Sequence, residues 1–195
     1  NFLDDLSPEA QKTESVNTIF LKDNKIFGHN TDINGFESAL ENINFKITNK
    51  KIFIIGAGGV VPSIIFALKR MKASEIIITN RTKKKAENLK TLFEDIKIFD
   101  WGKIPKFDVV INATSIGLKN DDVINLDFSK IENDKFYYDV IYNPKETNFL
   151  KTAKNLGNRV ENGKKMFLYQ AAEAFKIWHG IEPEINGDVM ELLDK

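Results

Sequence analysis

The stretch Lys51-Ile52-Phe53-Ile54-Ile55-Gly56-Ala57-Gly58-Gly59-Val60-Val61 joins a solid apolar run to a cluster of glycines. A continuous apolar run is typical of a strand in a parallel sheet, which is buried on both faces. The residues from about Val61 to Met71 have helical spacing, so the glycines lie between a buried strand and a helix. That context turns a weak glycine pattern into a useful one and predicts a dinucleotide-binding turn.

The glycines of this turn have separate physical roles in the predicted site. Gly56 permits the tight turn, Gly58 removes a side chain where a pyrophosphate must approach, and the helix N-terminus offers free N–H groups. Val61 stands where the general fingerprint has its third glycine, so the packing of helix on strand must accept a larger residue. A glycine-rich turn without a ligand is the structural alternative. The cofactor-binding residues predicted in the turn are Gly56, Ala57, Gly58, Gly59 and Val60.

Strands and helices alternate after the glycine turn. Apolar runs predict further strands at 76–78, 96–99, 109–111 and 137–140. Helical spacing predicts a helix over 83–93, and Arg159-Val160 is a candidate for one more edge strand. Such alternation is typical of βαβ units, which build a parallel sheet through right-handed crossovers. We therefore expect an α/β fold of the Rossmann type, a doubly wound parallel sheet with helices on both faces.

The segments on either side of this pattern differ from it. Two short strands over 15–20 and 26–28, with a turn between them, predict a hairpin, and helical spacing over 33–43 predicts a helix after it. The helices predicted beyond Thr147 run up to a C-cap at Gly157, from about 164 to 178 and from 188 to 193.

The composition excludes several classes of protein. The apolar fraction of 42% and the aromatic fraction of 11% are ample for a folded core. The 28 basic residues balance 28 acidic ones, which argues against binding to nucleic acid or to an anionic membrane through overall positive charge. With no cysteine and only His29 and His179, neither a disulfide framework nor a structural metal is expected. No apolar run approaches the roughly 20 residues that span a bilayer, and the first residues lack a signal-peptide layout, so the expected compartment is the cytoplasm.

Asn80-Arg81-Thr82 stands about 20 residues beyond the glycines, where an NAD-binding unit normally carries an acid. A carboxylate there would repel a 2′-phosphate, whereas an arginine offers planar donors to it and can stack on adenine. Lysines 83 to 85 follow, and their charges oppose the dipole at the start of the predicted helix, so a bound anion would be favourable there. One or two of these lysines are explained as the solvated first turn of the helix. NADP is therefore the expected cofactor, held by Asn80, Arg81, Thr82 and Lys85.

Seven short motifs along the chain occur in the order and approximate spacing of one enzyme family. They are Val16-Asn17-Thr18, Asn30-Thr31-Asp32, Gly56-Ala57-Gly58-Gly59, Asn80-Arg81-Thr82, Asn112-Ala113-Thr114-Ser115, Tyr142-Asn143-Pro144 and Gln170-Ala171-Ala172. Any one triplet is weak evidence, but seven in register are strong. The chain therefore resembles the shikimate dehydrogenase family. The resemblance implies reversible reduction of 3-dehydroshikimate to shikimate with NADPH, in the chorismate route to aromatic amino acids.

The resemblance also implies roles for residues on the substrate side. Asn17 and Asp32 would hydrogen-bond the hydroxyls of the substrate ring, with Asp32 also paired to a catalytic lysine. Tyr142 and Gln170 would reach the substrate as well. The structural alternatives are an N-cap of the following helix for Asp32, packing at a strand end for Tyr142, and an ordinary polar helix position for Gln170.

On the cofactor side, Thr114 and Ser115 follow a predicted strand at its carboxyl end, where open α/β sheets place their ligands. The resemblance implies that these two residues line the cofactor and that backbone groups near Val140 and Gly163 lie beside the nicotinamide. It gives no role to His29, so both histidines are interpreted as structural.

The chain departs from the family's pattern at its start. The family's paired serines, which hold the substrate carboxylate, and its catalytic lysine belong to a segment upstream of Asn1, so Asp32 is the catalytic residue expected within this sequence. Two alternatives stay open. One is a catalytically incompetent NADP-binding module, and the other is a quinate/shikimate dehydrogenase that uses NAD, against which Asn80-Arg81-Thr82 argues.

Three segments are expected in the chain. Residues 1–45 would be a remnant of an N-terminal α/β substrate-binding domain, residues 46–160 the NADP-binding Rossmann domain, and residues 161–195 C-terminal helices that pack back toward the substrate domain. The expected partner is a small-molecule substrate, shikimate or 3-dehydroshikimate, with no nucleic acid and no membrane. A homodimer is left open.

Overall fold

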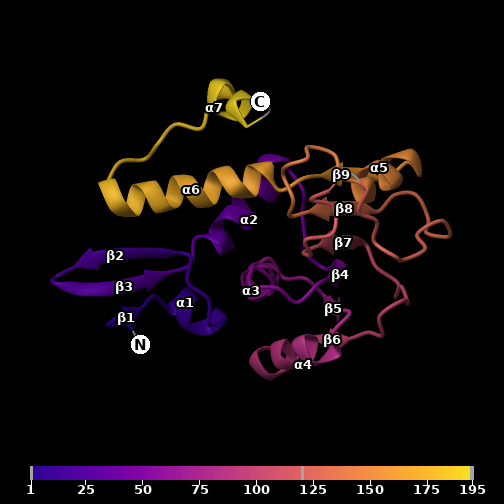
Figure 1. The fold of residues 1–195 in the computed structure, drawn as a ribbon, viewed down its shortest axis with the longest axis horizontal. Helices are drawn as coiled ribbons and strands as arrows, with labels where there is room; N and C mark the ends of the chain where they lie inside the picture. Colours follow the sequence, from indigo (N-terminus) through magenta and orange to yellow (C-terminus); the bar gives the residue numbers. More distant parts are fainter. Residues whose placement is uncertain (1, 120, 194–195) are drawn as a thin grey trace. The chain divides into compact units, whose positions relative to one another are not determined.

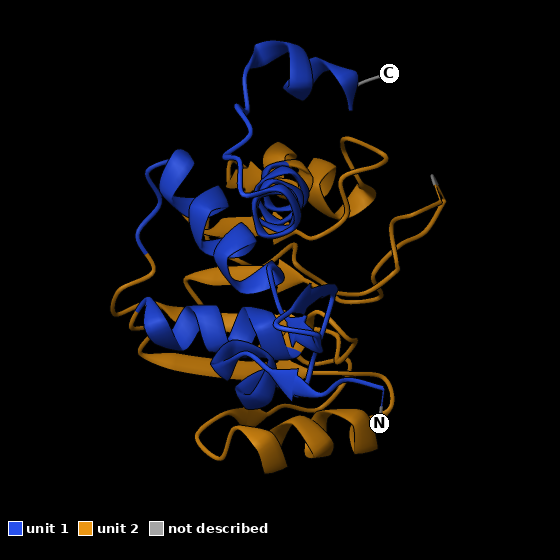
Figure 2. Ribbon diagram, turned by 90° about the vertical axis from the view of Figure 1, so that its left-hand side faces the viewer, with its two compact units in different colours: residues 1–46, 62–71, 165–195 blue, residues 47–61, 72–164 orange. Residues whose placement is uncertain are grey.

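Contacts divide the chain into two compact units. The computed structural model describes residues 2–119 and 121–193. The first unit comprises residues 1–46, 62–71 and 165–195, and the second comprises residues 47–61 and 72–164 (Figure 2). The chain therefore enters the first unit three times, and the residues that follow the glycine turn group with it. The three segments inferred from the sequence stay a prediction.

The second unit is built on a six-stranded parallel sheet (Figure 1). Its strands are β4 (Lys51–Ile55), β5 (Glu75–Thr79), β6 (Lys97–Ile98), β7 (Val109–Asn112), β8 (Phe136–Asp139) and β9 (Arg159–Glu161). Their order is β6-β5-β4-β7-β8-β9, and every neighbouring pair is parallel. This is the order of a doubly wound sheet, in which the direction of winding reverses between β4 and β7. The predicted Rossmann-type α/β fold is confirmed, and Arg159-Val160 belongs to the edge strand β9.

The helices that follow these strands bury one narrow face each. In α4 (Lys83–Leu92), Ala86 and Leu89 are buried at a spacing of one helical turn. In α5 (Asn148–Asn155), the buried residues are Phe149, Leu150 and Ala153, and the hydroxyl of the N-cap Thr147 accepts a hydrogen bond from the N–H of Leu150. The strand β4 is followed by α3 (Val61–Arg70), whose residues 62–70 belong to the first unit.

Aromatic side chains fill much of the core of the second unit. The ring of Phe107 stacks on Phe53 at 6.0 Å between centroids and meets the edge of Tyr137 at 6.0 Å. Phe128 and Phe149 meet at 5.8 Å with an interplanar angle of 69°. Every residue of β7 and β8 is buried, and β4 is buried after its first residue. These strands therefore accept continuous apolar runs, because they have no face toward water.

The first unit contains a three-stranded sheet with the order β1-β3-β2. The strand β1 (Asp5–Leu6) is parallel to β3 (Lys25–His29), and β2 (Thr18–Lys22) is antiparallel to it. The predicted hairpin is confirmed, although its first strand begins at Thr18 and not at residue 15. Both turn residues, Asp23 and Asn24, have positive φ angles of 51° and 60°, as a two-residue hairpin turn requires.

Two short elements near the start of the chain were not predicted from the sequence. The strand β1 has two residues and the helix α1 (Pro8–Thr13) has six, so neither is long enough to show a period. The usable signal for α1 was its start, because Ser7 caps the N–H of Ala10 at 3.2 Å and Pro8 is the first helical residue. The helices α2 (Asp32–Asn42), α6 (Lys164–His179) and α7 (Gly187–Leu192) lie close to their predicted positions. Within residues 2–119 and 121–193, no helix is both long and apolar enough to cross a membrane.

Candidate active site

Three residues predicted to bind the substrate lie together in the first unit. Asn17 precedes β2, Asp32 opens α2, and Gln170 lies in α6. Thr31, which is fully buried, hydrogen-bonds to Asn17 and Gln170 and directly precedes Asp32. Its backbone N–H donates to Oδ1 of Asn17 at 2.9 Å, Nδ2 of Asn17 donates to its hydroxyl at 3.0 Å, and this hydroxyl lies 3.3 Å from Oε1 of Gln170. The structure thus gathers polar groups from three elements that are far apart in the sequence.

Asp32 is the first residue of α2. The N-cap position belongs to Thr31, whose side chain makes no capping hydrogen bond with the described residues, so the interpretation of Asp32 as an N-cap is wrong. The backbone N–H of Asp32 donates to Oδ1 of Asn30 at 3.1 Å. Burial raises the pKa of the Asp32 carboxyl, and a hydrogen bond from Asn17 opposes this shift in part. A half-buried carboxyl with a raised pKa is suited to proton transfer.

Gly35 allows α2 and α6 to approach each other closely. A Cβ at this position would lie 2.7 Å from Cβ of Gln170 and 2.9 Å from the carbonyl oxygen of Met166. Both distances are shorter than side chains tolerate, so this approach requires glycine. Gly35 therefore contributes to the placement of Gln170 beside Thr31.

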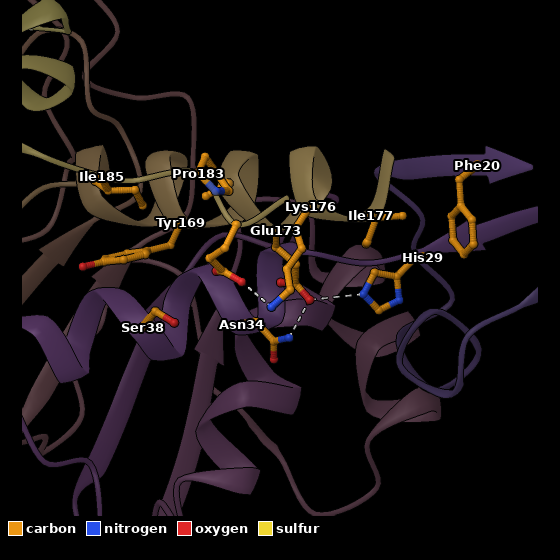
Figure 3. A pocket seen from close by; sticks show the side chains of 12 residues that line it. Phe20, His29, Asn34, Ser38, Tyr169, Glu173, Lys176, Ile177, Pro183 and Ile185 are labelled. Atoms are coloured by element: carbon orange, nitrogen blue, oxygen red, sulfur yellow. Dashed lines mark hydrogen bonds and ion pairs between the residues drawn. The ribbon is translucent and has the colours of Figure 1, made fainter. Parts of the chain in front are cut away.

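A cavity of about 820 Å³ lies in the first unit, lined by residues of α2, α6 and the segment 182–185 (Figure 3). The carboxylate of Glu173 accepts a hydrogen bond from Nδ2 of Asn34 at 2.7 Å and lies 3.4 Å from Nε2 of His29. The other ring nitrogen of His29 lies 2.7 Å from the Ser7 hydroxyl. Both nitrogens of His29 are therefore engaged, which supports its interpretation as a structural residue. Among the described residues, the lining contains none of the predicted substrate-binding side chains.

Gly56 makes the sharp turn that follows β4. Its φ is +116°, a conformation that favours glycine, and a Cβ there would lie 2.6 Å from the carbonyl oxygen of Ala113. At Gly58 the nearest atom to a Cβ would be 3.8 Å away, and at Gly59 no described atom would lie within 4 Å. Space therefore remains beside Gly58 and Gly59, as the close approach of a phosphate requires. The helix α3 begins at Val61, and its N-terminal dipole favours an anion.

Arg81 lies in the exposed loop between β5 and α4. Nδ2 of Asn80 donates to the carbonyl of Thr82 at 2.8 Å and so holds this loop in a turn. The first turn of α4 contains Lys83–Lys85 and no acid, and all three lysines are exposed. Positive charge is therefore concentrated at a helix N-terminus beyond the carboxyl end of β5, where an anion would be stabilised.

Thr114 and Ser115 follow β7 at its carboxyl end. Asn112, the buried last residue of β7, orients this loop, because its Oδ1 accepts hydrogen bonds from the N–H of Thr114 at 3.1 Å and from its hydroxyl at 2.7 Å. Ser115 is exposed. The loop emerges beside the glycine turn of β4, at the switch point where open α/β sheets bind their ligands.

Val140 and Gly163 lie against each other in the second unit. A Cβ on Gly163 would lie 2.0 Å from the carbonyl oxygen of Val140, so only glycine fits, and the Gly163 N–H donates to the carbonyl of Ile141 at 3.1 Å. Tyr142, half-buried, precedes the cis peptide Asn143-Pro144. Tyr142 therefore belongs to a different unit from the other predicted substrate-binding residues.

Several residues that hold these sites together were not predicted from the sequence. Thr31 and Asn112 are polar and fully buried, and buried polar groups are almost always hydrogen-bonded. Asn112 ends an apolar strand, which was the available signal. No sequence signal marked Gly35, because a single glycine within a helical pattern usually means only a small loss of helix stability.

Two family models match the chain. One, described as shikimate / quinate 5-dehydrogenase, matches residues 37–144, which is more than half of the sequence. The other, described as the C-terminal domain of shikimate 5′-dehydrogenase, matches residues 165–187. A relative from Pelagibacter ubique, named shikimate dehydrogenase (NADP(+)), is 56% identical over 193 residues, which cover 99% of this chain and 73% of the relative. The chain belongs to the shikimate/quinate dehydrogenase family.

Solved structures of shikimate and quinate dehydrogenases share this fold. The shikimate dehydrogenase of Thermus thermophilus, in complex with NADP(H) and shikimate, is 32% identical with a TM-score of 0.86, covering 98% of this chain and 71% of that one. The quinate dehydrogenase of Corynebacterium glutamicum, in complex with NAD, is 28% identical with a TM-score of 0.89 over the same shares. Because structures with either cofactor match equally well, the cofactor must be argued from individual residues.

Proposed function

We propose that this protein is an NADP-dependent dehydrogenase that interconverts 3-dehydroshikimate and shikimate. The observation that carries the proposal is the cluster of Asn17, Asp32 and Gln170 around Thr31, in a chain 56% identical to a relative named shikimate dehydrogenase (NADP(+)). A fold alone does not support an activity, whereas polar side chains brought together at one place in the fold do.

The residues of the second unit fit NADP. The space beside Gly58 and Gly59 is where a pyrophosphate would approach the backbone. Arg81 and the lysines after it supply positive charge for a 2′-phosphate, and the loop 80–82 has no acid for the ribose hydroxyls of NAD. When bound, NADPH would supply the hydride that reduces the ketone.

The remaining residues have defined tasks in this proposal. The side-chain amides of Asn17 and Gln170 offer donors and acceptors to the ring hydroxyls of the substrate. Asp32 holds a ring hydroxyl and takes part in moving the proton of the reacting oxygen, for which its raised pKa suits it. Tyr142 is the further residue assigned to the substrate. Thr114 and Ser115 line the cofactor, and backbone groups near Val140 and Gly163 lie beside its nicotinamide.

An assay of shikimate oxidation tests the proposal directly. With shikimate and NADP+, we expect formation of NADPH, followed by its near-ultraviolet absorbance, and a much lower rate with NAD+. Binding of NADP+ without any turnover of shikimate would contradict the enzymatic part and leave an NADP-binding module. A higher rate with NAD+ and quinate would contradict both the proposed cofactor and the proposed substrate.

The Gly58→Ala variant should bind NADP+ at least about tenfold more weakly, a loss of ~1.4 kcal/mol. Apart from its chain neighbours, a Cβ at this position meets no described atom closer than 3.8 Å, so the fold should be unaffected, whereas it would occupy the space of the pyrophosphate. Fluorescence titration gives the affinity and thermal unfolding gives the stability. Gly187→Ala is the matched control, because a Cβ there is likewise not obstructed, with no described atom within 4 Å, but lies in α7. Equal NADP+ affinity in both variants would rule out the glycine turn as the phosphate site.

A further inference from the structure

We propose that Asp139 is a positioning residue that keeps the groups beside the nicotinamide in place by holding together two loops of the NADP site. These are loop 113–118, which follows β7, and loop 140–147, which follows β8. The inference rests on the proposed function, because it concerns the same cofactor site.

Asp139 is the last residue of β8 and is fully buried. Its Oδ1 accepts hydrogen bonds from Nδ2 of Asn112 at 3.0 Å and from the N–H of Ile141 at 3.0 Å. Its Oδ2 accepts one from the hydroxyl of Thr147 at 2.7 Å. These three donors are neutral and come from the end of β7 and from both ends of loop 140–147, so one carboxyl joins the two loops.

The direction of the bond from Asn112 is set by backbone groups. A backbone N–H can only donate and a carbonyl can only accept. Oδ1 of Asn112 accepts the N–H of Thr114 at 3.1 Å, and its Nδ2 donates to the carbonyl of Ile116 at 3.0 Å. The second hydrogen of Nδ2 must therefore meet an acceptor, and Asp139 supplies it.

The direction of the bond from Thr147 is set in the same way. Its hydroxyl oxygen accepts the N–H of Leu150 at 3.4 Å as the N-cap of α5, which leaves the hydroxyl hydrogen to be donated. Asp139 accepts that hydrogen at 2.7 Å. The three hydrogen bonds to Asp139 thus require an acceptor at each of its two side-chain oxygens. A carboxylate has two acceptor atoms, whereas an amide has one acceptor and one donor.

The two loops also touch each other. A Cβ on Gly117 would lie 3.1 Å from Cγ2 of Thr147 and 3.2 Å from Cδ1 of Ile141. The N–H of Val140 donates to the carbonyl of Asn112 at 3.0 Å. A change in the hydrogen bonds of Asp139 should therefore move both loops, and with them the residues placed beside the nicotinamide.

A negative charge on Asp139 does not stabilise the fold, so stability does not explain why an aspartate is present here. Burial raises its pKa to about 6, although its three hydrogen bonds oppose the shift. A carboxyl with a higher pKa in the folded than in the unfolded state destabilises the fold once ionised, and this cost grows as pH rises through the interval between the two pKa values. Its three hydrogen bonds, in contrast, all run to Asp139 from the end of β7 and from loop 140–147, as expected of a residue that positions the two loops.

The Asp139→Asn variant tests the role with two ligands. An amide at this position places a donor against either Thr147 or the pair Asn112 and Ile141, whichever way it is oriented. We expect the affinity for NADP+ to fall about tenfold, while the affinity for 2′,5′-ADP, which has the 2′-phosphate but no nicotinamide, stays within about twofold of wild type. Calorimetric titration measures both.

The outcomes separate the inference from the proposed function. If the wild-type chain binds neither ligand, the proposed function fails. If the wild type binds both and the folded variant keeps its NADP+ affinity, or loses both affinities equally, the positioning role alone is overturned. Asp108→Asn is the control, because Asp108 also accepts a backbone N–H, that of Lys51 at 2.8 Å, but precedes β7 at the opposite end of the sheet. Its NADP+ affinity should equal that of wild type.

Substitutions at Thr147 decide the question even if Asp139→Asn does not fold. Thr147→Val removes the hydroxyl and keeps the shape of the side chain, whereas Thr147→Ser keeps the hydroxyl. We expect the valine variant to show the same selective loss of NADP+ affinity and the serine variant to bind both ligands as wild type does. Equal NADP+ affinities in the two variants would overturn the proposal.

Discussion

The Asp32→Asn variant is expected to oxidise shikimate about 10²- to 10⁴-fold more slowly than wild type, with unchanged affinity for NADP+. The amide keeps the shape of the side chain but cannot exchange a proton with the substrate. Because burial already raises the pKa of Asp32, a neutral side chain there should leave the fold intact. Initial rates give kcat, fluorescence titration gives the cofactor affinity, and thermal unfolding checks the fold.

A second acid of the first unit provides the control for Asp32. Asp188 lies in the first turn of α7, as Asp32 lies in the first turn of α2, but it is exposed. Asp188→Asn should have the turnover of wild type. If Asp32→Asn also keeps wild-type turnover, Asp32 has no part in proton transfer. If both variants lose activity, the loss reflects the substitution of a first-turn acid and not the chemistry of the site.

The Arg81→Ala variant should bind NADP+ about tenfold to a hundredfold more weakly and NAD+ as well as wild type does. A hydrogen bond to a charged group contributes about 1.5–3 kcal/mol, and only NADP+ has the 2′-phosphate that Arg81 would meet. Arg81 is exposed, so its removal should not affect folding. Parallel titrations with the two cofactors measure the change in preference.

The control for Arg81 lies at the other end of the following helix. Lys90→Ala removes one exposed positive charge from the last turn of α4, so it changes the net charge equally without changing the loop. This variant should keep both affinities. A wild-type chain that prefers NAD+, or an Arg81→Ala variant that loses NAD+ affinity as well, would contradict the 2′-phosphate role of Arg81.

The architecture of the second unit could be predicted because its signals are local. The run Ile52–Ile55 is buried on both faces, and Gly56 adopts a φ of +116° that its lack of a side chain permits. The hairpin turn at Asp23 and Asn24 is local as well. In contrast, β1 consists of two residues that pair with residues of β3 22 positions further along the chain, and no short-range pattern predicts such a contact.

The candidate site was predicted only in part, for the same reason. Asn17, Asp32 and Gln170 were assigned by resemblance, whereas the buried Thr31 that joins two of them was not. Asp139 follows three aromatic residues at the end of β8, and a polar residue in that position indicates only that the strand ends there. Its three donors come from positions 112, 141 and 147, and their convergence on one carboxyl depends on the pairing of β7 with β8.

Local sequence patterns were sufficient to predict the doubly wound sheet, the glycine turn and the positive charge around Arg81, because each of these depends on the identity and spacing of neighbouring residues. The pairing of buried polar groups became visible only in the folded chain: Thr31 pairs with Gln170, and Asp139 pairs with Asn112 and Thr147. The physical reason is that a buried donor or acceptor must find a partner wherever the chain brings one, and that partner is chosen by packing and not by distance along the sequence.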